Sequence, residues 1–175
     1  MICILLAPLV LAAQYNRLLI VHQLLSKGEQ IEKPHADNCS CAACIEISAS
    51  DSLRKAQIRL SAYKGLASEV YIALAYPDPI LQAFELSREL QTLAKVEHYF
   101  GEEYRKLVKQ LSRFVARLLD NVRGHEELEI LLNKTGLPHE EKFENLARFN
   151  LAIQYSEKGF VSHPNCQQKL INSRF

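Results

Sequence analysis

Four metal-binding side chains lie within ten residues of this chain, and they restrict the path of the backbone more than any other feature. They are His35, Cys39, Cys41 and Cys44, with six other residues between the first and the last. Zinc takes four such ligands in a tetrahedron, and one histidine with three thiolates leaves no position for water. Residues two apart in an extended segment project to the same side, so Cys39 and Cys41 can bind together before one turn brings Cys44 round. The spacing therefore predicts a closed, structural zinc site.

The alternatives for this cluster are a disulfide or a set of unrelated thiols. The chain has five cysteines, an odd number, and three of them fall between residues 39 and 44. A redox pair at Cys41 and Cys44 would need a thioredoxin-like βαβ context, which the sequence pattern lacks. The same pair has a common zinc-finger spacing, but no second pair follows it. We therefore favour a metal site and assign no finger class.

Size and charge exclude several classes of function. The chain has 175 residues, enough for one ordinary core, and its 21 basic residues face 20 acidic ones. Because nucleic-acid binders usually carry a strongly basic domain, no nucleic-acid partner is expected. Clustered thiols in odd number favour a reducing compartment over secretion.

The first 13 residues are uninterrupted apolar sequence, and they resemble a signal peptide or an anchor only superficially. A membrane span takes about 20 residues, and Pro8 lies in the middle of this stretch. No basic residues precede it, as a signal peptide would require. No other segment approaches a transmembrane length, so the chain is expected to behave as a soluble piece.

Residues 7–28 have the layout of one ankyrin repeat. Pro8 suits the first turn of a helix, Ala12 and Ala13 allow a neighbouring helix to approach, and Gly28 provides a left-handed exit from a second helix. A generic helical hairpin is the alternative interpretation. Because ankyrin arrays need about three or more repeats for stability, we expect that the array has lost its beginning.

The rest of the chain predicts an all-α fold. Asp51 is a good N-cap, and Asp78 followed by Pro79 restarts a helix after a break. The most regular amphipathic pattern runs from Tyr104 to Val122. Phe143, Leu146, Phe149 and Ile153 are expected to face inward on the last helix. The expected helices are residues 51–66, 69–75, 78–96, 104–122, 125–132 and, approximately, 139–157.

Taken in order, short motifs along nearly the whole chain resemble the amino-terminal cytoplasmic region of TRPC-type transient receptor potential cation channels. They are the repeat at 7–28, Pro34-His35 with Cys39-Ser40-Cys41 and Cys44, Asp51-Ser52-Leu53-Arg54, Ala62-Tyr63-Lys64-Gly65-Leu66-Ala67-Ser68, Asp78-Pro79-Ile80, Leu86-Ser87-Arg88-Glu89-Leu90, Leu118-Leu119-Asp120, Glu127-Leu128-Glu129, Leu131-Leu132-Asn133 and Pro164-Asn165-Cys166-Gln167-Gln168.

The resemblance implies three parts: a terminal, incomplete ankyrin repeat at 1–33, a zinc-binding connector at 34–50 and a linker-helix domain at 51–175. It also implies that His35, Cys39, Cys41 and Cys44 hold a structural zinc ion. Members of this family form homo- or heterotetrameric, calcium-permeable, non-selective cation channels of the plasma membrane. The chain would then lie on the cytoplasmic side and stop before the first membrane helix, so the pore would belong to a longer parent.

One helix carries a basic stripe with two interpretations. Five basic and no acidic residues fall between Tyr104 and Leu118. Arg105, Lys109, Arg113 and Arg117 resemble a calmodulin target or an acidic-lipid patch. The alternative is a solvated face, paired with the acidic 125–129 segment of a neighbour.

No catalytic residue is assigned. His125-Glu126 and His139-Glu140 do not continue as His-Glu-x-x-His, and the chain has no nucleophile elbow, phosphate loop or dinucleotide fingerprint. We therefore expect a non-enzymatic protein. The rival to a channel segment is a soluble, zinc-stabilised helical adaptor that binds other proteins.

Overall fold

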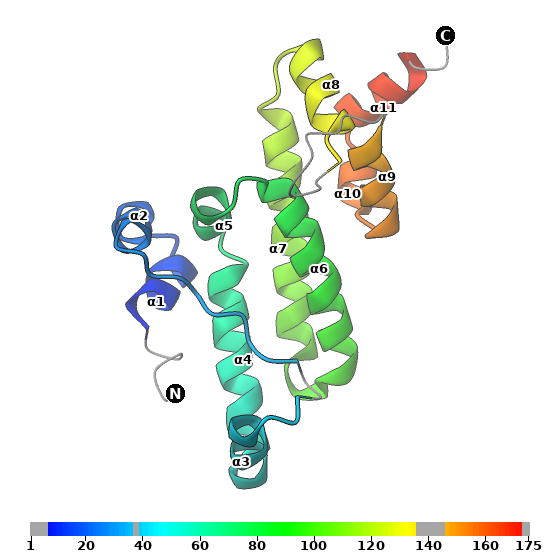
Figure 1. The fold of residues 1–175 in the computed structure, drawn as a ribbon. Coiled ribbons are helices and arrows are strands. Elements are labelled where there is room, and N and C mark those ends of the chain that lie inside the picture. The colour runs from blue at the N-terminus through cyan, green and yellow to red at the C-terminus, as the bar shows by residue number, and fades with distance from the viewer. Residues whose placement is uncertain (1–6, 37–38, 136–145, 173–175) are drawn as a thin grey trace.

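The fold is a stack of helices built around one long helical hairpin. The structure, a computed structural model, describes residues 7–36, 39–135 and 146–172. These residues form helices and no β-strand, which confirms the all-α prediction. Figure 1 shows α6 and α7 side by side at the centre, with α4 and α5 along one flank. None of the described helices is both long enough and apolar enough to cross a bilayer.

The amino-terminal hairpin comprises α1 (Pro8–Gln14) and α2 (Leu18–Ser26). Pro8 occupies the start of α1, and Gly28 leaves α2 with a φ of 83°, as expected from the sequence. Ala12 and Ala13 are buried, and α1 packs against α4. The hairpin is therefore as predicted, whereas its assignment to an ankyrin repeat stays a prediction.

The middle of the chain contains α3 (Ala42–Ser50), α4 (Ser52–Leu66) and α5 (Glu69–Ala75). The Asp51 carboxylate accepts the Arg54 backbone N–H at 2.9 Å, so the predicted N-cap of α4 is confirmed. Helix α3 lies within the expected connector and was not foreseen. Its nine residues show almost no amphipathic pattern, so the sequence carries no periodic signal for it.

The central hairpin is formed by α6 (Pro79–Val96) and α7 (Gly101–Asp120), joined by the short 3-10 helix η2 (His98–Phe100). Asp78 caps α6 by accepting the Leu81 backbone N–H at 3.0 Å. The apolar side chains of the two helices form the main core, including Phe84, Leu90 and Tyr104, each less than 1 % exposed. This hairpin gives the rest of the fold a rigid support.

The carboxyl-terminal part contains α8 (His125–Asn133), α9 (Ala147–Gln154), α10 (Lys158–Val161) and α11 (Pro164–Asn172). Within its described part, the single helix expected at about 139–157 is confirmed over Ala147–Gln154 but wrong at both ends of that span. Leu146 and Ser156 both have positive φ, so α9 begins at Ala147 and ends before a turn. Ile153, expected to face inward, is 55 % exposed, whereas Phe149 is buried as expected. Phe143 lies outside the described residues.

Candidate metal centre

The four predicted ligands come together at one point near the start of α3. His35 lies in the non-helical segment of residues 29–36, directly after Pro34, and the Cys39 N–H donates to the Ala36 carbonyl oxygen at 3.0 Å. Cys41 immediately precedes α3, and Cys44 lies in the first turn of that helix. The start of α3 therefore places two of the thiols, and the connector brings in the other two ligands.

The separations match those of a four-coordinate metal centre. The His35 Nδ1 atom lies 3.4 Å from each of the three sulfur atoms. A nitrogen at about 2.0 Å and a sulfur at about 2.3 Å from one tetrahedral zinc ion would lie about 3.5 Å apart. All four ligand atoms lie within 4.8 Å of one another. The cluster can therefore bind a metal ion with little rearrangement.

The thiols polarise one another in this arrangement. The Cys44 backbone N–H, together with the other thiols and His35, lowers the pKa of Cys41 to about 6. The pKa of Cys44 is raised to about 11, mainly by the hydrogen bond between its thiol and the Cys41 side chain and secondly by desolvation. Since a metal ligand must be the thiolate, metal binding here would release protons.

Two contacts hold the segment that precedes His35 on the helices. Tyr71 of α5 accepts the backbone N–H of Ile31 at 3.1 Å. Lys33 forms an ion pair with Glu89 of α6 at 2.8 Å. These two contacts fix the chain four and two residues before His35. Sequence analysis missed them because the partners lie 40 and 56 residues away, and no local pattern marks them.

A buried polar cluster lies behind the connector, between α4 and the central hairpin. Arg59 of α4 pairs with Glu97, and both side chains are less than 10 % exposed. Tyr104 of α7 donates to the second Glu97 oxygen at 2.6 Å. Arg59 and His35 also line one small apolar cavity of about 100 Å³, whose walls include Ile47 and Ile58. The cavity and the buried cluster thus connect the metal centre to the body of the fold.

The four residues of the basic stripe lie on α7, and all four are exposed. Within the described part of the chain, two of them form ion pairs and two do not. Arg105 pairs with Glu102, and Arg117 pairs with Glu69 of α5. Lys109 and Arg113 make no ion pair within the described residues. Binding of calmodulin or acidic lipid by this stripe stays a prediction.

The other histidine and cysteine side chains have different surroundings. His22 and His98 are exposed, whereas His163 is 8 % exposed and lies 3.0 Å from an Asp120 carboxylate oxygen. Cys166 is fully buried. Within the described part of the chain, none of these side chains joins the four-ligand cluster. Cys3 lies outside the described residues.

Comparison with known proteins supports the family resemblance that the motifs in the sequence indicate. The family described as "Transient receptor ion channel II" matches residues 39–101, which include three of the four ligands. Short transient receptor potential channel 4 of Mus musculus is 46 % identical over 166 residues, or 93 % of this chain. Short transient receptor potential channel 3 of Homo sapiens is 45 % identical over 170 residues, or 94 % of this chain. The chain spans only 17 % and 18 % of the length of these two relatives.

Proposed function

We propose that this chain, which belongs to the TRPC-type transient receptor potential channel family, is the cytoplasmic assembly and regulatory segment of a cation channel. The observation that carries the proposal is an identity of 45–46 % sustained over 93–94 % of the chain. The relatives are named as channels, which supports a non-enzymatic role. Calcium permeability, lack of ion selectivity and a position at the plasma membrane would be properties of the whole channel.

The proposed role follows from the arrangement of the helices. One contiguous core extends from Leu9 in α1 to Cys166 in α11, so the stack can transmit displacement as a unit. We propose the same three parts as the sequence suggests: an ankyrin-type repeat at 1–33, a metal-binding connector at 34–50 and a linker-helix domain at 51–175. Other subunits of a tetramer would be its partners.

The metal in this proposal is zinc, and its role is structural. His35, Cys39, Cys41 and Cys44 supply the nitrogen and sulfur donors that zinc prefers, in the number that closes its coordination shell. Bound zinc would supply a cross-link and no catalysis. It would join His35, which follows the Lys33–Glu89 ion pair to α6, to the start of α3.

Metal analysis tests the zinc site. Purified chain is expected to contain about one zinc ion, and Cys41→Ser is expected to lose most of it. Cys166→Ser is the matched control, because it removes a buried thiol that lies outside the cluster. A metal-free wild-type chain in which Cys41→Ser and His35→Ala leave stability unchanged would exclude the zinc site.

The second candidate is a soluble, zinc-stabilised adaptor, and the contiguous core favours it because a self-contained core is typical of an independent domain. Transcript sequencing on either side of these codons separates the two functions. For the channel, the transcript is expected to encode further ankyrin repeats upstream of these residues and membrane-spanning segments downstream of them. If both are missing, the channel proposal fails for this gene product and the adaptor remains.

Co-purification provides a second test of channel assembly. Tagged chain is expressed together with human short transient receptor potential channel 4, and the membrane fraction is solubilised in mild detergent. Retention of the tagged chain with the channel is expected for an assembly segment. Recovery of the tagged chain only in the supernatant left after the membranes are pelleted would contradict that role.

A further inference from the structure

Two hollows of about 340 and 480 Å³ lie along α7 where it faces α4 and α5, and Gln110 lines both of them. The first lies between α7 and the pair Tyr15 and Lys64, from the end of α1 and from α4. The second lies between α7 and Glu69 of α5. Between them the Gln110 side chain donates to the Ala67 carbonyl oxygen at 3.3 Å. We call the two hollows together the α7 groove.

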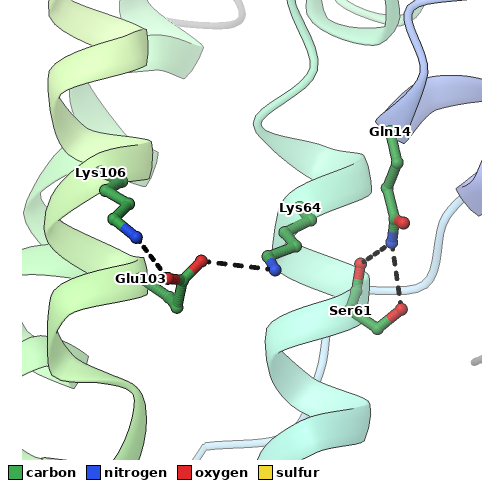
Figure 2. Close-up of polar contacts among 5 residues, drawn as sticks. All are labelled: Gln14, Ser61, Lys64, Glu103 and Lys106. Atoms are coloured by element: carbon green, nitrogen blue, oxygen red, sulfur yellow. Dashed lines mark hydrogen bonds and ion pairs between the residues drawn. The ribbon is translucent and has the colours of Figure 1, made fainter.

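The α7 groove has an excess of positive charge. Lys64, Lys106, Arg113 and Arg117 line it, against the two carboxylates of Glu69 and Glu103. Figure 2 shows Glu103 between the two lysines, at 3.5 Å from Lys64 and 2.6 Å from Lys106. Its hydrogen bond to Lys106 lowers the pKa of Glu103, so this carboxylate is ionised at neutral pH.

Two cations of the groove keep their charge available to a partner. Arg113 is exposed and makes no ion pair within the described part of the chain. Lys64 and Lys106 share a single carboxylate, so one of their two positive charges is not compensated. Arg117, by contrast, is neutralised by Glu69. The uncompensated charge therefore lies in the middle of the groove, around Lys106 and Arg113.

We propose that the α7 groove is a docking site for an acidic segment of a partner protein. From Glu103 to Arg117 the groove follows fourteen residue steps of helix, or about 21 Å at 1.5 Å per residue. An extended segment of about six residues has that length. Tyr15, which is 72 % exposed, lines the first hollow and offers the aromatic contact typical of binding hot spots.

The geometry favours an acidic segment over calmodulin or a bilayer. Calmodulin surrounds the apolar face of an amphipathic helix. That face of α7 is already buried, with Leu107, Leu111 and Phe114 at most 6 % exposed, so α7 would have to leave the core. A bilayer surface is flat, whereas Lys106 and Arg113 lie in hollows flanked by α4 and α5.

The test uses the full chain and a defined peptide probe. A fluorescein-labelled peptide with the sequence Glu-Leu-Glu-Glu-Leu-Glu is titrated with the protein, and binding is followed by fluorescence anisotropy. A peptide with lysine in place of glutamate is expected not to bind. Raising the salt concentration is expected to weaken binding, because exposed charges are screened.

Two double variants separate the groove from the general charge of α7. Lys106→Gln with Arg113→Gln removes two cations that line the groove. Arg105→Gln with Lys109→Gln removes two exposed cations of the same helix that do not line it. Lys106 and Arg105 each have an i,i+3 glutamate partner, so the two doubles are matched.

The groove double is expected to weaken peptide binding roughly tenfold, because it removes two exposed charge contacts. The control double is expected to change it less than twofold. Equal losses of peptide affinity in both double variants would show that the peptide responds only to the overall positive charge of α7, and would overturn the proposal. So would absence of peptide binding, or binding only to calcium-loaded calmodulin or to phosphatidylserine vesicles. Circular dichroism of each variant establishes that the fold is retained.

Discussion

Arg148 and Asp78 form a bidentate ion pair across 70 residues of sequence. The two Nη atoms of Arg148 donate to the two Asp78 carboxylate oxygens at 3.2 and 2.5 Å. Arg148 is only 1 % exposed, so the pair is largely shielded from water. Because Asp78 also caps α6, a single carboxylate both begins the central hairpin and holds α9 against it.

Asp78→Asn is expected to lower the free energy of unfolding by about 3 kcal/mol, because it leaves the buried guanidinium of Arg148 without its counter-ion. Asparagine is itself a good N-cap, so the capping contact to Leu81 is retained. Denaturant unfolding measures the change. Asp51→Asn is the control, since Asp51 caps α4 on the exposed surface. A similar small loss in both variants would mean that the ion pair adds nothing beyond the cap.

Two buried tyrosines should differ in what their hydroxyl groups contribute. Tyr63 donates to Glu89 and Tyr104 donates to Glu97, both at 2.6 Å. Burial raises the pKa of both phenols, so both remain donors across the neutral range. The Glu89 side chain is 31 % exposed, whereas that of Glu97 is 9 % exposed. Water can therefore replace the donor at Glu89 but not at Glu97.

Tyr104→Phe is accordingly expected to cost about 2 kcal/mol of unfolding free energy, in the range for a hydrogen bond to a charged group. Tyr63→Phe is expected to cost about half as much. Chemical denaturation of the two variants in the same buffer provides the comparison. A larger loss for Tyr63→Phe would contradict the assigned role of burial.

Gly65 permits the close approach of α4 to the amino-terminal hairpin. A Cβ atom at this position would lie 3.0 Å from the Ile31 Cδ1 atom and 3.3 Å from the Val10 Cγ1 atom. We expect Gly65→Ala to lower stability by about 1 kcal/mol, because overpacking outweighs the gain in helix propensity. Adding Ile31→Val removes the Cδ1 atom and should recover part of the loss. A double-mutant cycle measures this coupling, and strict additivity would exclude the contact.

Glu157 should make stability depend on pH. The residue is 4 % exposed, its Oε1 atom has no hydrogen-bond partner, and burial raises the pKa of its carboxyl group. The folded state therefore favours the protonated form. The stability that this preference contributes is complete below the unfolded pKa of about 4.3 and is lost as pH rises through the folded value.

Glu157→Gln is then expected to be more stable than the wild type at pH 7, by about 1.4 kcal/mol for each unit by which the folded pKa is raised. The advantage should shrink toward pH 4. Unfolding curves at both pH values give the two differences. A constant difference between wild type and variant at the two pH values would rule out titration of Glu157 as the cause.

Removal of the metal should loosen α3 before the rest of the fold. This helix packs on α4, and Ile45 on its surface is 56 % exposed, so apolar burial stabilises it weakly. Chelation is expected to speed backbone amide exchange in α3 more than about tenfold, because ligand binding and folding are coupled in small metal sites. Amides of α6 and α7 should be unaffected. Zinc-saturated chelator is the control, and uniform loss of protection would contradict a local role.

Local chemistry made most of the helices predictable. Some residues act on the backbone within three positions of themselves, so the sequence alone predicts their effects. They are Asp51, Asp78 with Pro79, and Gly28. The metal ligands were found for the same reason, since ten consecutive residues contain all four. A proline at the first position of a helix also marks α11 at Pro164, a signal that the sequence analysis did not use.

Tertiary packing decided the elements that sequence analysis predicted wrongly. Leu146 and Ser156 adopt positive φ although neither residue favours it, and this confines α9 to eight residues. Within α9 the buried residues are Arg148, Phe149 and Ala152, whereas Ile153 near its end remains exposed. The partners of Arg148 and Lys33 lie at Asp78 and Glu89, far away in sequence. No local pattern can reveal such pairs.

The segment between α2 and the metal centre is held at three closely spaced residues. Ile31, Lys33 and His35 each contact a different partner: Tyr71, Glu89 and the three thiols. Only Pro34 separates Lys33 from His35. One inserted or deleted residue between them would change the length of chain from the Lys33–Glu89 ion pair to the imidazole by up to about 3.5 Å. This short segment can therefore vary in composition, but hardly in length, if all four ligands are to meet.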